Sequence, residues 1–160
     1  LNHTLKINAD RFTPIDEISI PTGELIPVDG TPFDFTSEKT IGRDIEADYI
    51  QLKNGLGYDH NFCIADYDGT LKTAAIAKGD KSGIVMTVKT DLPGIQLYTG
   101  NFLNDEAHPF KGGYNQSVQT FFCLETQCMP DSMNHEGFTN GILRPGEVYD
   151  YVTEYKFLTK

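Results

Sequence analysis

The chain has little of several features that mark common classes of protein: no tryptophan, three cysteines, three arginines and no long apolar run in 160 residues. A membrane-spanning helix needs about 20 consecutive apolar residues, so we expect no membrane partner. Arginine pairs with phosphate through two hydrogen bonds, and its scarcity argues against a phosphate ester as ligand. The formal net charge of −10 argues against nucleic acid, whose binding needs clustered lysine and arginine. A neutral partner fits this composition.

We expect the three cysteines to be reduced thiols and not a disulfide framework, because their number is odd and no two have C-x-x-C spacing (Cys63, Cys123 and Cys128). Zinc needs about four ligands at short spacing, which the sequence does not assemble, so we expect no metal. Reduced thiols are typical of a reducing compartment, so we expect a cytoplasmic protein. Residue 1 is leucine, and no basic-then-apolar signal segment follows it. We therefore expect either that a leader has been removed or that the chain belongs to a longer polypeptide.

Short segments with alternating polar and apolar residues recur along the chain, at residues 5–8, 84–89, 95–98 and 149–155. Glycine (15 residues) and proline (8 residues) punctuate them at turn-like pairs such as Asp68-Gly69 and Pro93-Gly94. Short strands separated by such turns are typical of an antiparallel β sandwich or barrel. We predict an all-β fold in which residues 1–160 belong to a single domain.

One stretch, residues 38–52, has a helical rather than an alternating pattern. Apolar residues stand there at the spacing i, i+4, i+8 and i+11 (Ile41, Ile45, Tyr49 and Leu52), and Ser37 is a possible N-cap. We predict at most one short surface helix. Residues 104–120 are polar and glycine-rich, so we expect a long loop next to a site.

Glu125 is the first candidate for chemistry. It follows the apolar run of residues 121–124, and on alternation it shares a face with Cys123 and Gln127. A carboxylate at the mouth of an apolar strand loses solvation, which raises its pKa toward the range useful for a general base. The alternative is that Glu125 stands at an exposed strand end.

Asp59 and His60 are adjacent, so in a strand their side chains point to opposite faces and cannot cooperate. His60 shares its face with Phe62 and Ile64, which favours core packing. Asp59 faces the other way, with Asn61, where it either accepts hydrogen bonds from sugar hydroxyls or caps a turn after Gly57.

Gln96 and Tyr98 project from one face of a predicted strand, opposite Ile95 and Leu97. An amide next to an aromatic ring is what a carbohydrate site requires: hydrogen bonds to hydroxyls and a flat surface for C–H groups. The alternative is an ordinary half-exposed strand. The other histidines (His3, His108 and His135) are isolated, and we expect them on the surface or in loops.

Seven blocks of the chain resemble the aldose 1-epimerase (galactose mutarotase) family, in the order that the family has them. They are residues 7–17 (INADRFTPIDE), 20–24 (IPTGE), 30–35 (GTPFDF), 57–62 (GYDHNF), 93–102 (PGIQLYTGNF), 124–127 (LETQ, with Pro130-Asp131) and 143–147 (LRPGE). The blocks span essentially the whole chain and are similar to the C-terminal half of the family.

The resemblance implies a large antiparallel β sandwich and the interconversion of the α and β anomers of free aldoses such as glucose and galactose, without a cofactor. The family's general base falls on Glu125, and two groups that bind sugar hydroxyls fall on Asp59 and Gln96. The family's general acid is a histidine in the N-terminal half, before residue 1, and none of the four histidines here matches its motif. The resemblance therefore implies a second partner besides the sugar, namely that N-terminal half.

Two departures from the family pattern lie just before Glu125, where Gln119 and Phe121 replace a basic residue and a small glycine; Thr139 also replaces a proline after Phe138. They leave open a rival function, a sugar-binding or regulatory module that has kept the pocket and lost turnover. A third option, a hexose-6-phosphate epimerase, predicts an arginine-lined pocket, which this half does not show.

Overall fold

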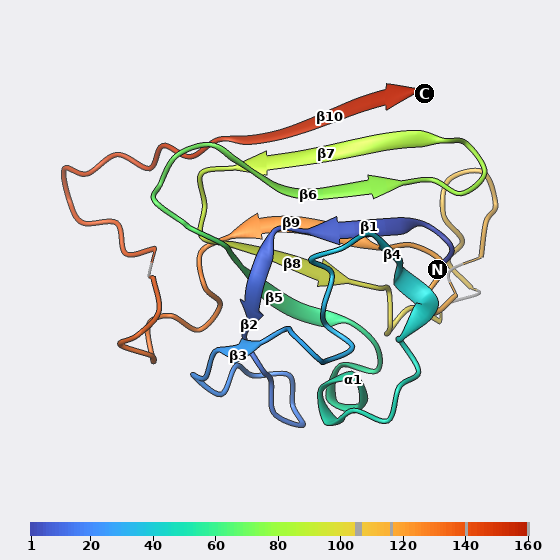
Figure 1. Ribbon diagram of the computed structural model, residues 1–160, viewed down its shortest axis with the longest axis horizontal. Coiled ribbons are helices and arrows are strands. Elements are labelled where there is room, and N and C mark those ends of the chain that lie inside the picture. Colours follow the sequence, from blue (N-terminus) through green and yellow to red (C-terminus); the bar gives the residue numbers. More distant parts are fainter. Residues whose placement is uncertain (105–106, 116, 140, 160) are drawn as a thin grey trace.

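Two five-stranded antiparallel sheets enclose the core of the computed structural model, which describes residues 1–104, 107–115, 117–139 and 141–159 (Figure 1). Sheet A has the strand order β10 (Thr153–Thr159), β7 (Ile84–Thr90), β6 (Lys72–Lys78), β1 (Thr4–Ile7) and β4 (Lys39–Thr40). Sheet B has the order β3 (Ile26–Pro27), β2 (Ala9–Phe12), β5 (Asp59–Ile64), β8 (Gly94–Tyr98) and β9 (Cys123–Gln127). The all-β sandwich predicted from the sequence is confirmed.

A single residue, Asn8, carries the chain from sheet A to sheet B. Its N–H donates to the carbonyl of Ala74 in β6 over 2.8 Å, and its carbonyl accepts the N–H of Ala65, next to β5, over 2.9 Å. Both backbone groups of this exposed residue are therefore paired at the crossing. Asn8 thereby fixes the two sheets against each other at one corner.

The core fills the space between the sheets with side chains from both. Leu5 and Ile7 of β1 meet Phe62 of β5 and Leu97 of β8, and all four are at most 1% exposed. Phe33 stacks on Phe12 with ring centroids 4.2 Å apart, and aromatic pairs of this kind add about 0.5–1.5 kcal/mol to burial. This apolar layer packs against the inner face of sheet B and leaves its outer face for other side chains.

The predicted helix over residues 38–52 with an N-cap at Ser37 is wrong in its position. The structure has β4, a 3-10 turn (η1, Ile41–Arg43) and then one α-helix (α1, Ile50–Gly55), whose N-cap is Tyr49. The apolar residues that suggested the helix are still buried, with Ile41 1%, Ile45 5% and Leu52 4% exposed. The spacing therefore indicates which side chains face the core. An irregular segment can bury side chains at this spacing as well as a helix can.

The predicted strands at 5–8, 84–89 and 95–98 match β1, β7 and β8. The predicted strand at 149–155 lies further along, because β10 runs from Thr153 to Thr159. Predicted segment 104–120 is irregular in its described part, with one isolated bridge between Phe110 and Tyr114; residues 105, 106 and 116 lie outside the described residues.

Candidate functional site

Polar side chains of three neighbouring strands share the outer face of sheet B. In the strand register Asn61 of β5 pairs with Gln96 of β8, which pairs with Glu125 of β9. The next row contains Asp59 and Tyr98, again from β5 and β8. Because directly paired residues point to the same side of a sheet, these groups lie next to one another although they are far apart in the sequence.

A depression of about 350 Å³ lies over these rows. Its lining includes all three residues that the sequence analysis singled out for a site (Glu125, Asp59 and Gln96), together with Tyr98, Phe102, Gln127 and Pro130. Tyr98 and Phe102 stack with ring centroids 6.2 Å apart, so one wall is aromatic and the floor is polar. Such a mixture suits a neutral, hydroxyl-rich ligand with an apolar ring face.

Asp59 is half-buried at the start of β5, and both its carboxylate and its backbone N–H are hydrogen-bonded. Its carboxylate Oδ1 accepts a hydrogen bond of 2.8 Å from Nε2 of Gln96. Its own N–H donates to Nδ1 of His60 over 3.1 Å. Burial raises the pKa of Asp59, and the bond from Gln96 lowers it in part. The turn-capping alternative is not what the side chain does, because its partner is the Gln96 amide across the sheet.

Glu125 is exposed, and it makes no hydrogen bond or ion pair with the described residues. The loss of solvation expected from the preceding apolar run is therefore absent in this chain. The physical reason is that β9 begins only at Cys123: Phe122 packs against the core, and the Phe121 ring stands edge-on to Tyr98 at 6.2 Å. Its carboxylate is free to act on a ligand in the depression.

His60 is packed in the core, as predicted, with no exposed surface. Since Nδ1 accepts the N–H of Asp59, the ring proton is on Nε2, which donates to Oε1 of Gln51 over 3.1 Å. Burial lowers the pKa of His60 to about 3, so the ring is neutral at physiological pH. It cannot serve as a proton donor to a ligand, because it points away from the depression.

The other histidines also lie away from the depression. His3 stands 3.4 Å from Asp80, and His135 contacts Asp131 and the carbonyl of Pro21, each at 3.2 Å. His108 is exposed in the 104–120 segment. None of these three is among the residues that line the depression.

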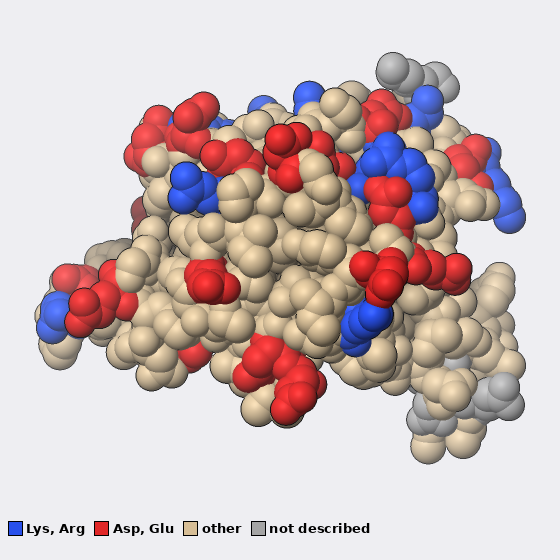
Figure 2. All heavy atoms as spheres, turned by 60° about the horizontal axis from the view of Figure 1, so that its bottom comes forward, with Lys and Arg blue, Asp and Glu red and all other residues tan. Residues whose placement is uncertain are grey.

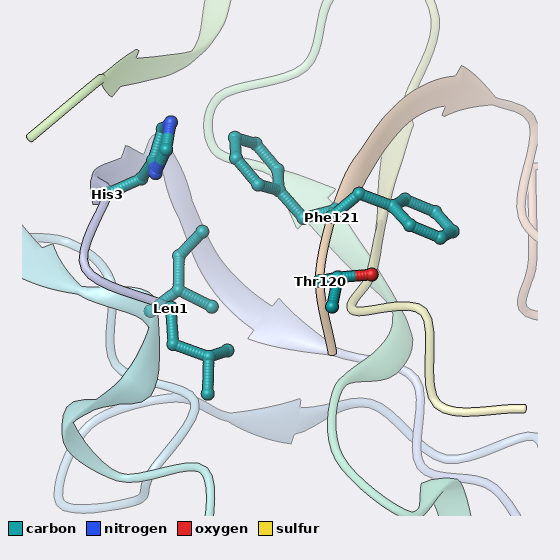
Figure 3. Close-up of a pocket in the computed structure, with 6 residues that line it drawn as sticks. Leu1, His3, Thr120 and Phe121 are labelled. Carbon is teal, nitrogen blue, oxygen red and sulfur yellow. The ribbon is translucent and has the colours of Figure 1, made fainter. Parts of the chain in front are cut away.

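A second hollow, of about 250 Å³, lies at the other end of the β9 segment (Figure 3). Figure 3 shows Leu1 and His3 on one side of it and Thr120 and Phe121 on the other. Among the described residues that line it, His3 is the one with a titratable side chain, and the carboxylate of Asp80 next to His3 is not part of the lining. Acid–base chemistry needs two groups, so the depression around Glu125 is the better candidate.

The two departures noted before Glu125 lie at the Tyr98 end of the site rather than in its lining. Gln119 has a left-handed backbone (φ 57°), and its side chain donates to the carbonyl of Leu56 over 3.4 Å. Phe121 packs closely on Gly100, where a Cβ atom would stand 3.0 Å from its ring.

The sequence analysis assigned no role to Asn61, Gln127, Phe102 or Pro130. Alternation did place Asn61 on the face of Asp59 and Gln127 on the face of Glu125, because each pair is two residues apart in one strand, but it indicated no hydrogen-bond partner for either amide. Phe102 and Pro130 follow strand ends, and periodicity carries no signal for such positions.

The distribution of charged residues does not indicate a second candidate site. Figure 2 shows Asp and Glu spread over one face among uncharged residues, with fewer Lys and Arg. Within the four described ranges, no group of three or more His, Cys, Asp or Glu could hold a metal ion. In the same ranges, no helix has the length and apolar character that crossing a membrane requires. The three cysteines are free thiols.

The chain belongs to the aldose 1-epimerase family, because the family model matches residues 1–156. It is 40% identical over 156 residues to the galactose mutarotases of Homo sapiens and Bos taurus, and 39% identical over 162 residues to the aldose 1-epimerase of Escherichia coli. These alignments cover 98–99% of this chain but 44–46% of the relatives. The chain thus spans less than half the length of the curated relatives it matches.

Solved structures show the same fold. The aldose epimerase homologue from C. elegans superposes with a TM-score of 0.83 at 28% identity, covering 99% of this chain and 46% of that one. The galactose 1-epimerase from Lactobacillus acidophilus superposes with a TM-score of 0.75 at 29% identity, covering 98% and 44%. The sandwich described above is therefore the galactose mutarotase type of β fold.

Proposed function

We propose that this chain forms the part of an aldose 1-epimerase that supplies the general base and two groups that bind sugar hydroxyls. The whole protein then interconverts the α and β anomers of free hexoses such as glucose and galactose. The observation that carries the proposal is the meeting of Glu125, Asp59 and Gln96, from three strands, in one depression with an aromatic wall.

Ring opening of a hexose needs one proton removed from the anomeric hydroxyl and one delivered to the ring oxygen. We assign the first step to Glu125, whose carboxylate is free to accept that proton. The ring C–O bond breaks, the aldehyde end rotates, and closure from the other side gives the other anomer. Asp59 and Gln96 hold the remaining hydroxyls in place, and no cofactor takes part.

We place the general acid, a histidine, in the part of the family domain that this chain does not span. The arrangement of the four histidines supports this assignment, since His60 is buried behind the sheet and the other three do not line the depression. A base alone would leave a poor alkoxide leaving group at the ring oxygen, so we expect the chain by itself to be inactive. We also propose a cytoplasmic location, supported by the three free thiols.

An exposed apolar part of sheet A supports the proposal that the remaining part of the family domain is a partner of this chain. One row of paired residues runs across the inner face of the sheet from Leu5 through Ala77 and Met86 to Phe157. Leu5 and Ala77 are 0% and 3% exposed, whereas Phe157 is 62% exposed. Sheet B therefore covers only part of this inner face, and we propose that strands of the remaining family domain cover Phe157.

The rival function, a sugar-binding or regulatory module without turnover, is the one that the departures at Gln119 and Phe121 leave open. Polarimetry separates the two. The chain would be combined with the complementary part of an aldose 1-epimerase and the optical rotation of fresh α-glucose and α-galactose followed. We expect faster mutarotation than with either part alone. Sugar binding without acceleration by a correctly assembled pair would favour the rival and refute the enzyme assignment.

A further inference from the structure

We propose that Gln127 is a positioning residue that fixes the side-chain amide of Gln96 with its NH2 group toward Asp59. The sequence analysis assigned no role to this glutamine. The structural part of the inference stands on the described contacts alone, and its effect on aldose binding rests on the proposed function.

The three side chains form a directed series of hydrogen bonds across the sheet. Nε2 of Gln127 donates to Oε1 of Gln96 over 3.0 Å. Nε2 of Gln96 donates in turn to Oδ1 of Asp59 over 2.8 Å. Each amide thus gives a hydrogen toward the carboxylate, and hydrogen bonds arranged in series polarise and strengthen one another.

The direction follows from the chemistry of the carboxylate. An ionised Asp59 can only accept, so Gln96 must present its NH2 group to it. The oxygen of Gln96 then faces β9, where only a donor is a good neighbour. Gln127 provides that donor, and either amide in the opposite orientation would bring two acceptors or two donors together. The orientation of Gln96 is therefore fixed by groups at both of its ends.

Gln127 is itself fixed by a buried neighbour. Its Nε2 also donates to Oδ1 of Asn61 over 3.0 Å, so both of its N–H bonds are directed. Asn61 is 1% exposed, and its own Nδ2 contacts Sδ of Met129 at 3.2 Å. Gly94 leaves the room for this amide, since a Cβ there would stand 2.3 Å from Oδ1 of Asn61.

The arrangement leaves binding capacity free where a sugar would lie. The second oxygen of Asp59 and the second N–H of Gln96 make no hydrogen bond to the described residues. One acceptor and one donor side by side match the two functions of a sugar hydroxyl. With Gln96 reversed, this site would present two acceptors and repel the lone pairs of the hydroxyl oxygen.

The test compares Gln127→Glu and Gln127→Met with the unchanged chain by ¹³C NMR of the Asp59 carboxyl during a pH titration. Gln127→Glu replaces the donor with an acceptor, which should turn Gln96 over and remove its bond to Asp59. It also adds a like charge, and the two effects together should raise the Asp59 pKa by about 1 unit. Gln127→Met removes the donor without adding charge and should raise that pKa by a smaller amount. Glu125, Cys123 and Tyr98 also face this side of the sheet and are unchanged in every sample.

Gln119→Glu is the matched control, because it makes the same replacement outside the series and should leave the titration of Asp59 unchanged. An Asp59 pKa within about 0.2 units of the unchanged chain in Gln127→Met, with folding intact by circular dichroism, would overturn the proposal, because this variant removes the donor without adding charge. A second readout is the binding of α-glucose by calorimetry to the assembled protein, which should weaken about tenfold in Gln127→Glu. If the NMR shift occurs but the unchanged protein binds no aldose, the proposed function fails and the positioning role stands.

Discussion

Asp59 combines its proposed binding role with a cost to stability. Burial raises its pKa above the ordinary value, so the folded chain holds this proton more tightly than the unfolded chain does. Between the ordinary pKa of about 3.9 and the raised one, stability therefore falls as the pH rises. At neutral pH the ionised carboxylate works against folding.

We predict that Asp59→Asn raises the free energy of unfolding at pH 7, and that this gain shrinks as the pH is lowered toward about 4. The same variant should bind aldoses about tenfold more weakly in the assembled protein, since one charged hydrogen bond is lost. Urea unfolding at several pH values measures the first effect and calorimetry the second. A variant that is less stable than the unchanged chain at pH 7 would show that the carboxylate is a net stabiliser.

His60 makes stability depend on pH in the opposite sense. Its folded pKa, lowered to about 3 by burial, lies below the ordinary value near 6.5. The contribution of the neutral His60 ring to the free energy of unfolding is fully present above pH 6.5. It is lost as the pH falls toward 3, because the unfolded chain takes up the proton first.

We predict that the unchanged chain loses about 2 kcal/mol more of its free energy of unfolding between pH 7 and pH 5 than His60→Gln does. Glutamine keeps an acceptor and a donor but does not titrate, so the comparison removes the contributions of all other groups. Denaturant unfolding at the two pH values gives the difference directly. Equal losses in both proteins would mean that folding does not lower the pKa of His60.

At the scale of elements, α1 ends in a strained residue. Leu56 follows the helix with φ 53° and ψ 31°, a left-handed conformation that favours glycine, and its side chain is 59% exposed. We predict that Leu56→Gly stabilises the chain by about 0.5–1 kcal/mol, measured by thermal and urea unfolding. Lys53→Gly, inside the same helix and exposed, should destabilise it by about 1 kcal/mol. Destabilisation by both variants would show that the backbone at Leu56 is unstrained.

Elements with regular alternation could be predicted from the sequence, and those without it could not. β1, β7 and β8 were located because their polar and apolar residues alternate between a core face and an outer face. β10 was placed too early, since Tyr149 and Tyr151 alternate although they precede the strand. The 38–52 segment misled because burial at a helical spacing does not require a helix.

At the scale of the whole molecule, the sandwich is unequally covered. Phe157 and Leu158 are neighbours in β10 with similar exposure, 62% and 52%, but only Phe157 shares the inner face of sheet A with Leu5. We predict that Phe157→Thr weakens association with the complementary part of an aldose 1-epimerase at least about tenfold, as judged by analytical ultracentrifugation. Leu158→Thr, on the opposite face, is the matched control. Equal weakening by both variants would refute the inner face as the docking surface.

More of the candidate site than of its surroundings could be predicted from the sequence. Glu125, Asp59 and Gln96 were named from residue type, alternation and resemblance, and strand pairing brings them together. The exposure of Glu125 is the alternative that the sequence analysis left open, because the sequence does not tell where β9 begins or which residues lie over it. The series through Gln127 depends on hydrogen-bond directions across two strands, which no pattern within a single strand contains.

The central claim is that the Glu125 carboxylate removes the anomeric proton, and the rate of anomer exchange in the Glu125→Gln variant tests it most directly. Saturation-transfer NMR of the α and β signals of glucose would measure that rate in the assembled protein. We predict a fall of about 10²–10⁴ for Glu125→Gln and no change for Glu46→Gln, an exposed glutamate outside the site. Exchange at the unchanged rate in Glu125→Gln would contradict the account.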